Sequence, residues 1–268
     1  VNNITFVSYF KRKETKKNNF LLENKSYQNF IHQLQMVLSQ LKKIKRKIKL
    51  ILINFEYKGL STEQIFSKIY KDGSWDKKAL NFNSGPGSHN QKLVLPYVKF
   101  VNSFLIDKKL KSIIDLGCGD FNVGKNIYKH VHKYYAFDIV PDLIKTNKTK
   151  FNDKKIVFEC KNFIDDTLPK ADGVIIRQVL QHLDNKSIVK ILNKIKSYKY
   201  AIITEHIPKN IFTPNIDKNI GLTTRLEFNS GINVEIEPFN FNFITKKEII
   251  LEDKELGGVH KTAIYTLN

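Results

Sequence analysis

Apolar positions in the central and C-terminal chain fall into short runs separated by longer amphipathic stretches. Five such runs are rich in Ile, Val and Tyr and cover residues 111–116, 133–138, 155–160, 172–177 and 199–204. Short β-prone runs that alternate with helical patterns predict an α/β fold, with a mostly parallel sheet and helices on both faces. Two further β-prone runs, 241–252 and 259–267, flank Gly257-Gly258 and predict a closing antiparallel hairpin.

The N-terminal part follows a helical period instead. Between residues 27 and 55 apolar residues recur every three or four positions with lysines between them, at Ile31, Leu34, Leu38, Leu41, Ile44, Ile48 and Ile51. This spacing predicts one long amphipathic helix, which we expect to pack on the main domain or on a second copy of the chain as a homodimer contact. A basic helix on an acidic membrane is the alternative. Residues 1–26 are polar and unpatterned, and we expect them to be loosely ordered.

These patterns divide the chain into three parts. Residues 1–58 form a basic extension that contains the long helix, residues 59–110 a helical lid or cap, and residues 111–268 the α/β domain. Within the second part Ser61 is expected to cap a helix, and the Gly- and Pro-rich stretch 83–89 predicts a loop. A helix of roughly 91–109 should follow.

The formal charge of +19 changes this picture little. Only four of the 45 basic residues are arginine, and the lysine excess accompanies many Asn and Ile residues, a bias that needs no acidic partner. Nucleic acid is therefore not an expected partner. Cys118 and Cys160 lie far apart in a chain without a secretory signal pattern, so we expect a cytoplasmic protein without disulfides or a bound metal. The longest apolar stretch is too short for a transmembrane span, which needs about 20 residues.

A glycine-rich loop follows the first predicted strand, in Ile113-Ile-Asp-Leu-Gly-Cys-Gly-Asp-Phe-Asn-Val-Gly. At the carboxyl end of a parallel strand such a loop lets a ligand approach the backbone, and a helix is expected next. Asn122 occupies the position where a dinucleotide fingerprint needs a small residue, which disfavours a pyrophosphate site. Asp138 ends the next strand, where a carboxylate can accept two hydrogen bonds from a ribose diol.

Five motifs together resemble class I S-adenosylmethionine-dependent methyltransferases, notably bacterial ones found among surface-polysaccharide or natural-product genes. They are Ile69-Tyr-Lys-Asp-Gly-Ser-Trp, Ser84-Gly-Pro-Gly-Ser-His, Asp115-Leu-Gly-Cys-Gly-Asp-Phe, Arg177-Gln-Val-Leu-Gln-His-Leu and Thr204-Glu-His-Ile-Pro. The resemblance implies a Rossmann-like sheet that binds S-adenosylmethionine and releases S-adenosylhomocysteine. It also implies the cofactor-binding residues Asp115, Gly117, Cys118, Gly119, Asp138, Ile139, Asn162, Phe163, Arg177 and Gln178. Asn162 replaces a commoner Asp, and an ordinary loop asparagine is the alternative.

Methyl transfer to a hydroxyl benefits from a base, and histidine suits that task. His182 and His206 follow the fourth and fifth strands and are the candidate catalytic residues, although His182 could equally order its loop. Candidate acceptor-binding residues are Trp75, His89, Glu205 and Arg225. Trp75 could instead be a core aromatic. Arg225, a rare arginine, could bind a phosphate or carboxylate, or pair with a neighbouring glutamate.

The leading hypothesis is an O-methyltransferase that acts on a small-molecule or carbohydrate-linked acceptor, for example a sugar- or phosphate-bearing intermediate of surface-polysaccharide biosynthesis. An RNA methyltransferase is an alternative because of the positive charge, but the chain has no recognisable RNA-binding module. A non-catalytic cofactor-binding scaffold is the alternative from another class. The glycine loop and Asp138 argue against it.

Overall fold

The computed structural model describes residues 25–76 and 82–267, and the chain divides after Lys58 into two units. The first contains the long helix α2 (Lys25–Glu56), which confirms the helix predicted for residues 27–55. Several of its apolar side chains are exposed, among them Leu34, Leu41 and Ile48. The expectation of loose order for residues 1–26 falls almost wholly outside the described part of the chain.

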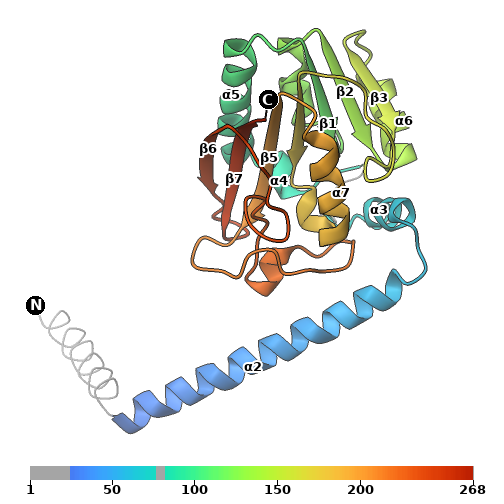
Figure 1. Cartoon of the computed structure of the whole chain (residues 1–268). Helices are drawn as coiled ribbons and strands as arrows, with labels where there is room; N and C mark the ends of the chain where they lie inside the picture. Colours follow the sequence, from blue (N-terminus) through green and yellow to red (C-terminus); the bar gives the residue numbers. More distant parts are fainter. Residues whose placement is uncertain (1–24, 77–81, 268) are drawn as a thin grey trace, which may run out of the picture. The chain divides into compact units, whose positions relative to one another are not determined.

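The second unit is built on a sheet that has seven strands within the described residues (Figure 1). The strands are β1 (Ser112–Leu116), β2 (Lys133–Asp138), β3 (Ile156–Cys160), β4 (Gly173–Arg177), β5 (Tyr200–Ile207), β6 (Thr245–Glu252) and β7 (Val259–Thr266). Their order is β3-β2-β1-β4-β5-β7-β6, with β1 to β5 parallel and β7 antiparallel to both neighbours. All predicted strands and the closing hairpin are confirmed.

One boundary differs in a way that matters for the site. The apolar run ends near Thr204, but β5 continues to Ile207 because its pairing with β7 extends to Ile207 opposite Val259. Glu205 and His206 therefore lie within the strand. Tertiary pairing prolonged a strand whose local pattern had become polar.

Helices pack around this sheet, and their ends follow the local capping signals. They are α3 (Thr62–Lys71), α4 (Pro86–His89), α5 (Gln91–Asp107), α6 (Pro141–Lys150) and α7 (Asn185–Ile195). Ser61 forms a capping box with Gln64 at the start of α3, and Asp184 caps α7 through the backbone N–H of Ser187. The cap expected at Ser61 is thus confirmed. Helix α6 lies against β2 and β3 (Figure 1).

The segment after the glycine loop is not the expected helix. It forms two short 3-10 turns, η1 (Gly124–Asn126) and η2 (Tyr128–His130). Phe121 adopts a positive φ of 61° and is fully buried, with its ring against Tyr134 and Phe158. Turning Phe121 into the core bends the backbone at the point where a helix would begin.

Candidate active site

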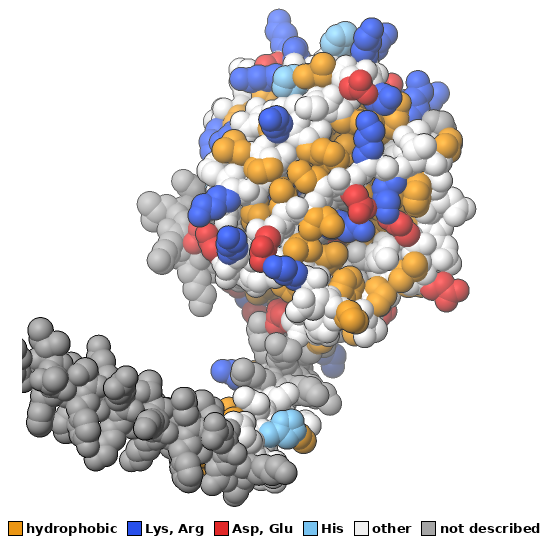
Figure 2. Space-filling view, turned by 90° about the vertical axis from the view of Figure 1, so that its left-hand side faces the viewer, with side chains coloured by type: hydrophobic (Ala, Val, Ile, Leu, Met, Phe, Trp, Pro, Cys, Tyr) orange, Lys and Arg blue, Asp and Glu red, His pale blue; other side chains and the backbone are white. Residues whose placement is uncertain are grey.

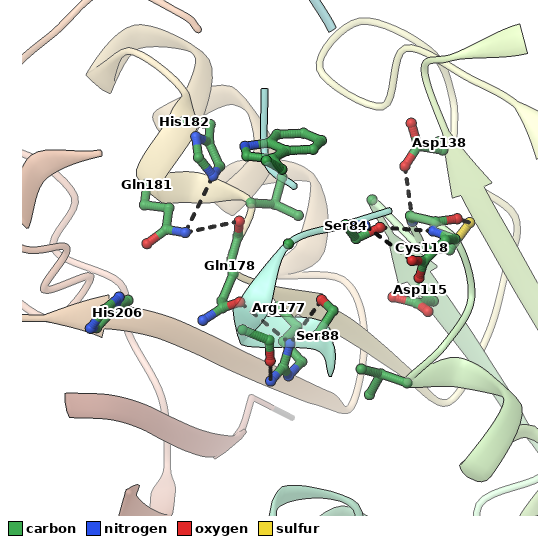
Figure 3. A pocket seen from close by; sticks show the side chains of 18 of the residues that line it. Ser84, Ser88, Asp115, Cys118, Asp138, Arg177, Gln178, Gln181, His182 and His206 are labelled. Carbon is green, nitrogen blue, oxygen red and sulfur yellow. Dashed lines mark hydrogen bonds between the residues drawn. The ribbon is translucent and has the colours of Figure 1, made fainter. Parts of the chain in front are cut away.

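A cavity of about 520 Å³ opens where β1, β2 and β4 end. Its volume falls in the range of small-molecule sites, about 300–1,000 Å³. Asp115 and Asp138 line one side, and Gln181, His182 and His206 line the other, with Arg177 and Gln178 between them (Figure 3). Polar groups from four strands of an open sheet thus meet in one place, as expected for a ligand site of this topology.

The glycines of the loop after β1 are required by backbone conformation and by space. Gly117 and Gly119 have φ values of +80° and +56°, which side chains rarely tolerate. A Cβ on Gly119 would lie 2.3 Å from Ser84 Oγ, and one on Gly117 would lie 2.4 Å from Val179 Cγ2. Both glycines and the intervening Cys118 line the cavity. The loop therefore offers bare backbone to a ligand.

Asp138 at the end of β2 is held ready to accept further hydrogen bonds. Its two carboxylate oxygens each accept one backbone N–H, from Gly119 at 3.0 Å and from Val140 at 3.2 Å. An ionised carboxylate has about four acceptor sites, so capacity for a diol remains. Burial raises the pKa of Asp138 to about 6, because desolvation outweighs these hydrogen bonds.

Asp115 at the end of β1 is a second buried carboxyl group in the cavity wall. Tyr134 donates its hydroxyl to Asp115 Oδ2 at 2.8 Å. Burial raises the pKa of Asp115 to about 7. Two acids that face one cavity with little compensating charge indicate a ligand that brings hydroxyl or ammonium donors.

The loop that contains Ser84 closes over the glycine loop. Ser84 Oγ accepts the backbone N–H of Asp120 at 2.9 Å, and the backbone N–H of Ser84 donates to Asp120 Oδ2 at 3.0 Å. Arg177 donates to the carbonyl of Gly87 at 2.7 Å and stacks over the ring of Tyr97. This loop is therefore a fixed wall of the cavity. His89 lies outside the lining, with its Nε2 2.6 Å from Asp120 Oδ2.

Trp75 is packed among aromatic side chains of the cap segment and also faces the cavity. Its ring packs edge-on against Tyr70, with centroids 4.6 Å apart, and lies 5.6 Å from the ring of His182. It also lines the cavity. The aromatic core of the cap segment thus forms part of the site wall.

His182 is buried in the 3-10 turn η3 (Leu180–His182) after β4 and is held by both ring nitrogens. Nδ1 lies 3.2 Å from the carbonyl oxygen of Gly221, and Nε2 lies 3.3 Å from the amide nitrogen of Gln181. The tautomer that satisfies both contacts carries its proton on Nδ1. Burial lowers the pKa of His182 to about 3. A group with so low a pKa is a weak base.

Gln181 was not singled out in the sequence, although it belongs to the Arg177-Gln-Val-Leu-Gln-His-Leu motif. Its side chain lines the cavity, and its carbonyl oxygen Oε1 is buried with no hydrogen-bond partner among the described residues. A buried acceptor without a donor costs about 1–3 kcal/mol. The hydroxyl group of a bound methyl acceptor could donate a hydrogen bond to this oxygen of Gln181.

Arg225 and Glu205 are buried supports rather than walls of the cavity. The five N–H groups of Arg225 make five hydrogen bonds, to the carbonyls of Ile216, Leu180, Gln181 and Leu183 and to Asn185 Oδ1. Glu205 accepts the backbone N–H groups of Leu180 and Gln181, and burial raises its pKa to about 8. Arg225 therefore has no donor left for a phosphate or carboxylate of a substrate. It stabilises the fold instead of binding an anion.

The remaining candidates divide between the wall and its surroundings. Ile139 and Phe163 line the cavity, whereas Asn162 does not. Asn162 instead caps its own turn: Oδ1 accepts the backbone N–H of Ile164, and Nδ2 donates to Asp165. This is the loop role weighed as the alternative to adenine binding.

The far end of the cavity contains a cluster that the sequence did not reveal. His206 and His260 both line the cavity, and His260 contacts Asp253. Burial, followed by the neighbouring His206, lowers the pKa of His260. The pairing of β5 with β7 brings His206 beside His260, and the hairpin of β6 and β7 brings Asp253 to the same place.

Comparisons with known proteins identify the fold first. Three similar solved structures are human N-acetylserotonin methyltransferase in complex with S-adenosylmethionine, magnesium protoporphyrin IX methyltransferase from Synechocystis with bound S-adenosylmethionine, and an N-methyltransferase from Bradyrhizobium japonicum. Identities are 18%, 13% and 9%, with TM-scores of 0.50, 0.53 and 0.51. The alignments cover 78%, 78% and 65% of this chain and 60%, 99% and 96% of those chains, respectively. The sheet is therefore that of a Rossmann-like methyltransferase.

The family follows from the sequence. The O-methyltransferase domain family matches residues 40–202, about three-fifths of the chain. The chain belongs to this family and is an S-adenosylmethionine-dependent methyltransferase, which confirms the class, cofactor and fold expected from the motifs. No curated protein matches the sequence.

Proposed function

We propose that this enzyme transfers a methyl group to a hydroxyl of a small molecule. The observation that carries the proposal is that one cavity joins the carboxyl groups of Asp115 and Asp138 to the unsatisfied carbonyl oxygen of Gln181. The two acids match a ligand rich in hydroxyl and ammonium donors, and Gln181 matches an acceptor that carries an O–H group.

The cofactor side fits S-adenosylmethionine by its donor and acceptor chemistry. Asp138 would accept the ribose hydroxyls, Asp115 would face the amino group of the methionine part, and Gly117 and Gly119 would leave room for it. When bound, the cofactor supplies an electrophilic methyl group. Asp138 already bonds to the loop that contains Gly119, so the carboxylate and the loop are positioned as one unit.

The acceptor side consists of Trp75, Gln181 and His182. We assign His182 a positioning role, because its contacts fix Gln181 and Trp75 while its low pKa makes it a poor proton acceptor. We place proton removal at the end of the cavity that holds His206 and His260. A closed, preorganised site favours transfer by holding the oxygen in line with the methyl group and excluding water.

The size of the cavity supports a small acceptor over a polymer. On the face shown in Figure 2, Lys and Arg side chains are scattered among apolar ones and form no single basic tract. This distribution gives no support to the RNA alternative. The proposed setting in surface-polysaccharide biosynthesis rests on the motif resemblance, and the cytoplasmic location on the cysteine pattern. Arg225 adds no support for a phosphorylated acceptor.

The test combines calorimetry with a transfer assay. The full chain should bind S-adenosylmethionine and S-adenosylhomocysteine, and should transfer labelled methyl groups to some members of a panel of hydroxylated sugars and phenols. Gln181→Leu should leave cofactor affinity unchanged and lower kcat/KM for the acceptor about tenfold, the value of one lost hydrogen bond of about 1.4 kcal/mol. Absence of cofactor binding would contradict the proposal.

A further inference from the structure

Three buried side chains meet at the end of the cavity away from the glycine loop: His206 of β5, His260 of β7 and Asp253, which follows β6. One ligand atom from each lies within 4.8 Å of the other two. His206 and His260 are directly opposite in the antiparallel register of β5 and β7, so their side chains share one face of the sheet. Figure 3 shows His206 across the cavity from Asp138.

The contact between His260 and Asp253 has a length that two ligands of one metal ion can have. His260 Nε2 lies 3.2 Å from Asp253 Oδ2. Two ligand atoms bound to one ion at about 2.1 Å, with angles of about 90–110°, lie about 3.0–3.4 Å apart.

The surrounding residues orient the three side chains. Asp253 Oδ1 accepts the backbone N–H groups of Glu255 and Leu256, which leaves Oδ2 to face His260. The amide nitrogen of Gln178 lies 3.0 Å from His260 Nδ1 and 3.2 Å from Nε2. Gln178 holds a left-handed backbone conformation with a φ of 57°, which a glutamine rarely adopts. Hydrogen bonds such as those to Asp253 are typical of carboxylates that bind a metal ion.

The turn at Gly257 and Gly258 passes close to His206, and Gly258 has no room for a side chain. Gly258 has a φ of +80°, and a Cβ there would lie 2.6 Å from the carbonyl oxygen of Ile207 and 3.0 Å from His206 Nε2. The Gly257 carbonyl oxygen lies 2.5 Å from the same nitrogen. Gly258 therefore lets the backbone approach His206, and the carbonyl oxygen of Gly257 lies beside the cluster.

We propose that His206, Asp253 and His260 bind a divalent transition-metal ion, and that this ion takes the oxygen of the methyl acceptor as a further ligand. Two imidazoles and one carboxylate suit Zn²⁺ and its first-row neighbours. Both histidines line the cavity that contains the cofactor loop, so the ion has an open position towards the ligand space. The inference deepens the proposed function and depends on it for the identity of the acceptor.

The ion gives the reaction a route for the hydroxyl proton. Coordination lowers the pKa of the acceptor hydroxyl, as it does for bound water. The O–H bond breaks and its proton passes to water. The oxygen then forms a bond to the methyl carbon while the carbon–sulfur bond breaks, and the electron pair of that bond stays on sulfur. No redox change is involved.

The test uses the full chain without an affinity tag, stripped by a chelator and then titrated with Co²⁺. One equivalent should bind and produce the visible absorption bands of a protein-bound ion, and Zn²⁺ should displace it. His260→Gln and His206→Gln should each weaken binding at least tenfold, because even changes outside the ligand set cost about 10–100-fold. Asp253→Asn should do the same, with its unfolding temperature measured because Asp253 also caps its turn.

The matched control is the double variant His130→Gln/His132→Gln, which removes two exposed histidines away from the cavity and should leave Co²⁺ binding unchanged. Failure of the wild-type chain to bind one equivalent, or loss of binding in the control, would overturn the metal site. Cofactor binding by the stripped chain, followed by calorimetry, reports on the proposed function separately. If the stripped chain bound cofactor and methylated at the full rate, the acceptor role of the ion would be refuted.

Discussion

At the residue scale, the cavity depends on carboxyl groups whose burial opposes their ionisation. Asp138 has a pKa of about 6 in the ligand-free protein, above its usual value of 3.8. Burying a carboxylate stabilises its protonated form, whereas accepting hydrogen bonds from a ribose stabilises its charged form. The fold therefore favours the protonated form of Asp138, whereas the proposed ligand favours its ionised form.

We predict that affinity for S-adenosylmethionine falls as the pH is lowered through about 6. Ligand hydroxyls bind the ionised carboxylate, so binding lowers the pKa of Asp138, and protons compete with the cofactor below that value. Calorimetry between about pH 5 and 7 measures the effect. Asp138→Asn should weaken binding roughly 100-fold at pH 7 and leave only the pH dependence that Asp115, with a pKa of about 7, contributes. The exposed Asp142→Asn is the control and should behave as wild type.

Arg225 was a candidate for substrate binding, but in the structure it stabilises the fold. We predict that Arg225→Lys lowers the unfolding temperature markedly, since several of its five hydrogen bonds to buried acceptors cannot be remade. A loss of about 3 kcal/mol would lower Tm by roughly 6–12 °C in a protein of this size. Thermal unfolding measures it. A raised KM for the acceptor at an unchanged Tm would restore the substrate-binding hypothesis.

At the scale of elements, the site is the contact between two loops. Ser84 and Asp120 exchange hydrogen bonds, and Gly119 lies so close to Ser84 that no side chain fits between them. The cap segment and the cofactor loop therefore form one rigid wall, although they are separated in the sequence by the whole of α5.

We predict that Gly119→Ala abolishes measurable cofactor binding, because the new Cβ would lie 2.3 Å from Ser84 Oγ in addition to the strain of a positive φ. Gly59→Ala is the matched control: Gly59 also has a positive φ, of +79°, but nothing lies within 4 Å of the added carbon. It should cost about 1 kcal/mol of stability and leave affinity intact. Near-normal binding by Gly119→Ala would show that the two loops separate easily.

At the scale of the whole molecule, α2 carries a regular series of exposed apolar side chains. Leu34, Leu38, Leu41, Ile44, Ile48, Leu52 and Phe55 are exposed and span 21 residues in six steps, an average spacing of 3.5. That period is the one by which helices pair in a coiled coil. No helix in the described part of the chain is both long and apolar enough to cross a bilayer. We propose a second copy of the chain as the partner of α2.

We predict that the full chain is a dimer and that the double variant Leu41→Glu/Ile48→Glu is a monomer, because four buried charges per dimer would oppose pairing. Light scattering coupled to size exclusion measures the mass. Lys45→Glu, on the same helix but outside the apolar series, should remain dimeric. A monomeric wild-type chain would contradict the proposal, and cofactor binding should persist in every case.

The sequence by itself determined the strands, the caps at Ser61 and Asp184, the class of enzyme and the cofactor loop. These features are encoded by neighbouring residues, through hydrophobic period, capping chemistry and a glycine pattern at a strand end. Only the tertiary structure decided the roles of Arg225, Glu205 and Gln181, because a buried polar group takes its function from partners that lie far away in the chain. The same holds for the cluster of His206, Asp253 and His260: a hairpin brings Asp253 to His260, but His206 joins them only through the pairing of β5 with β7, two strands that are distant in the sequence.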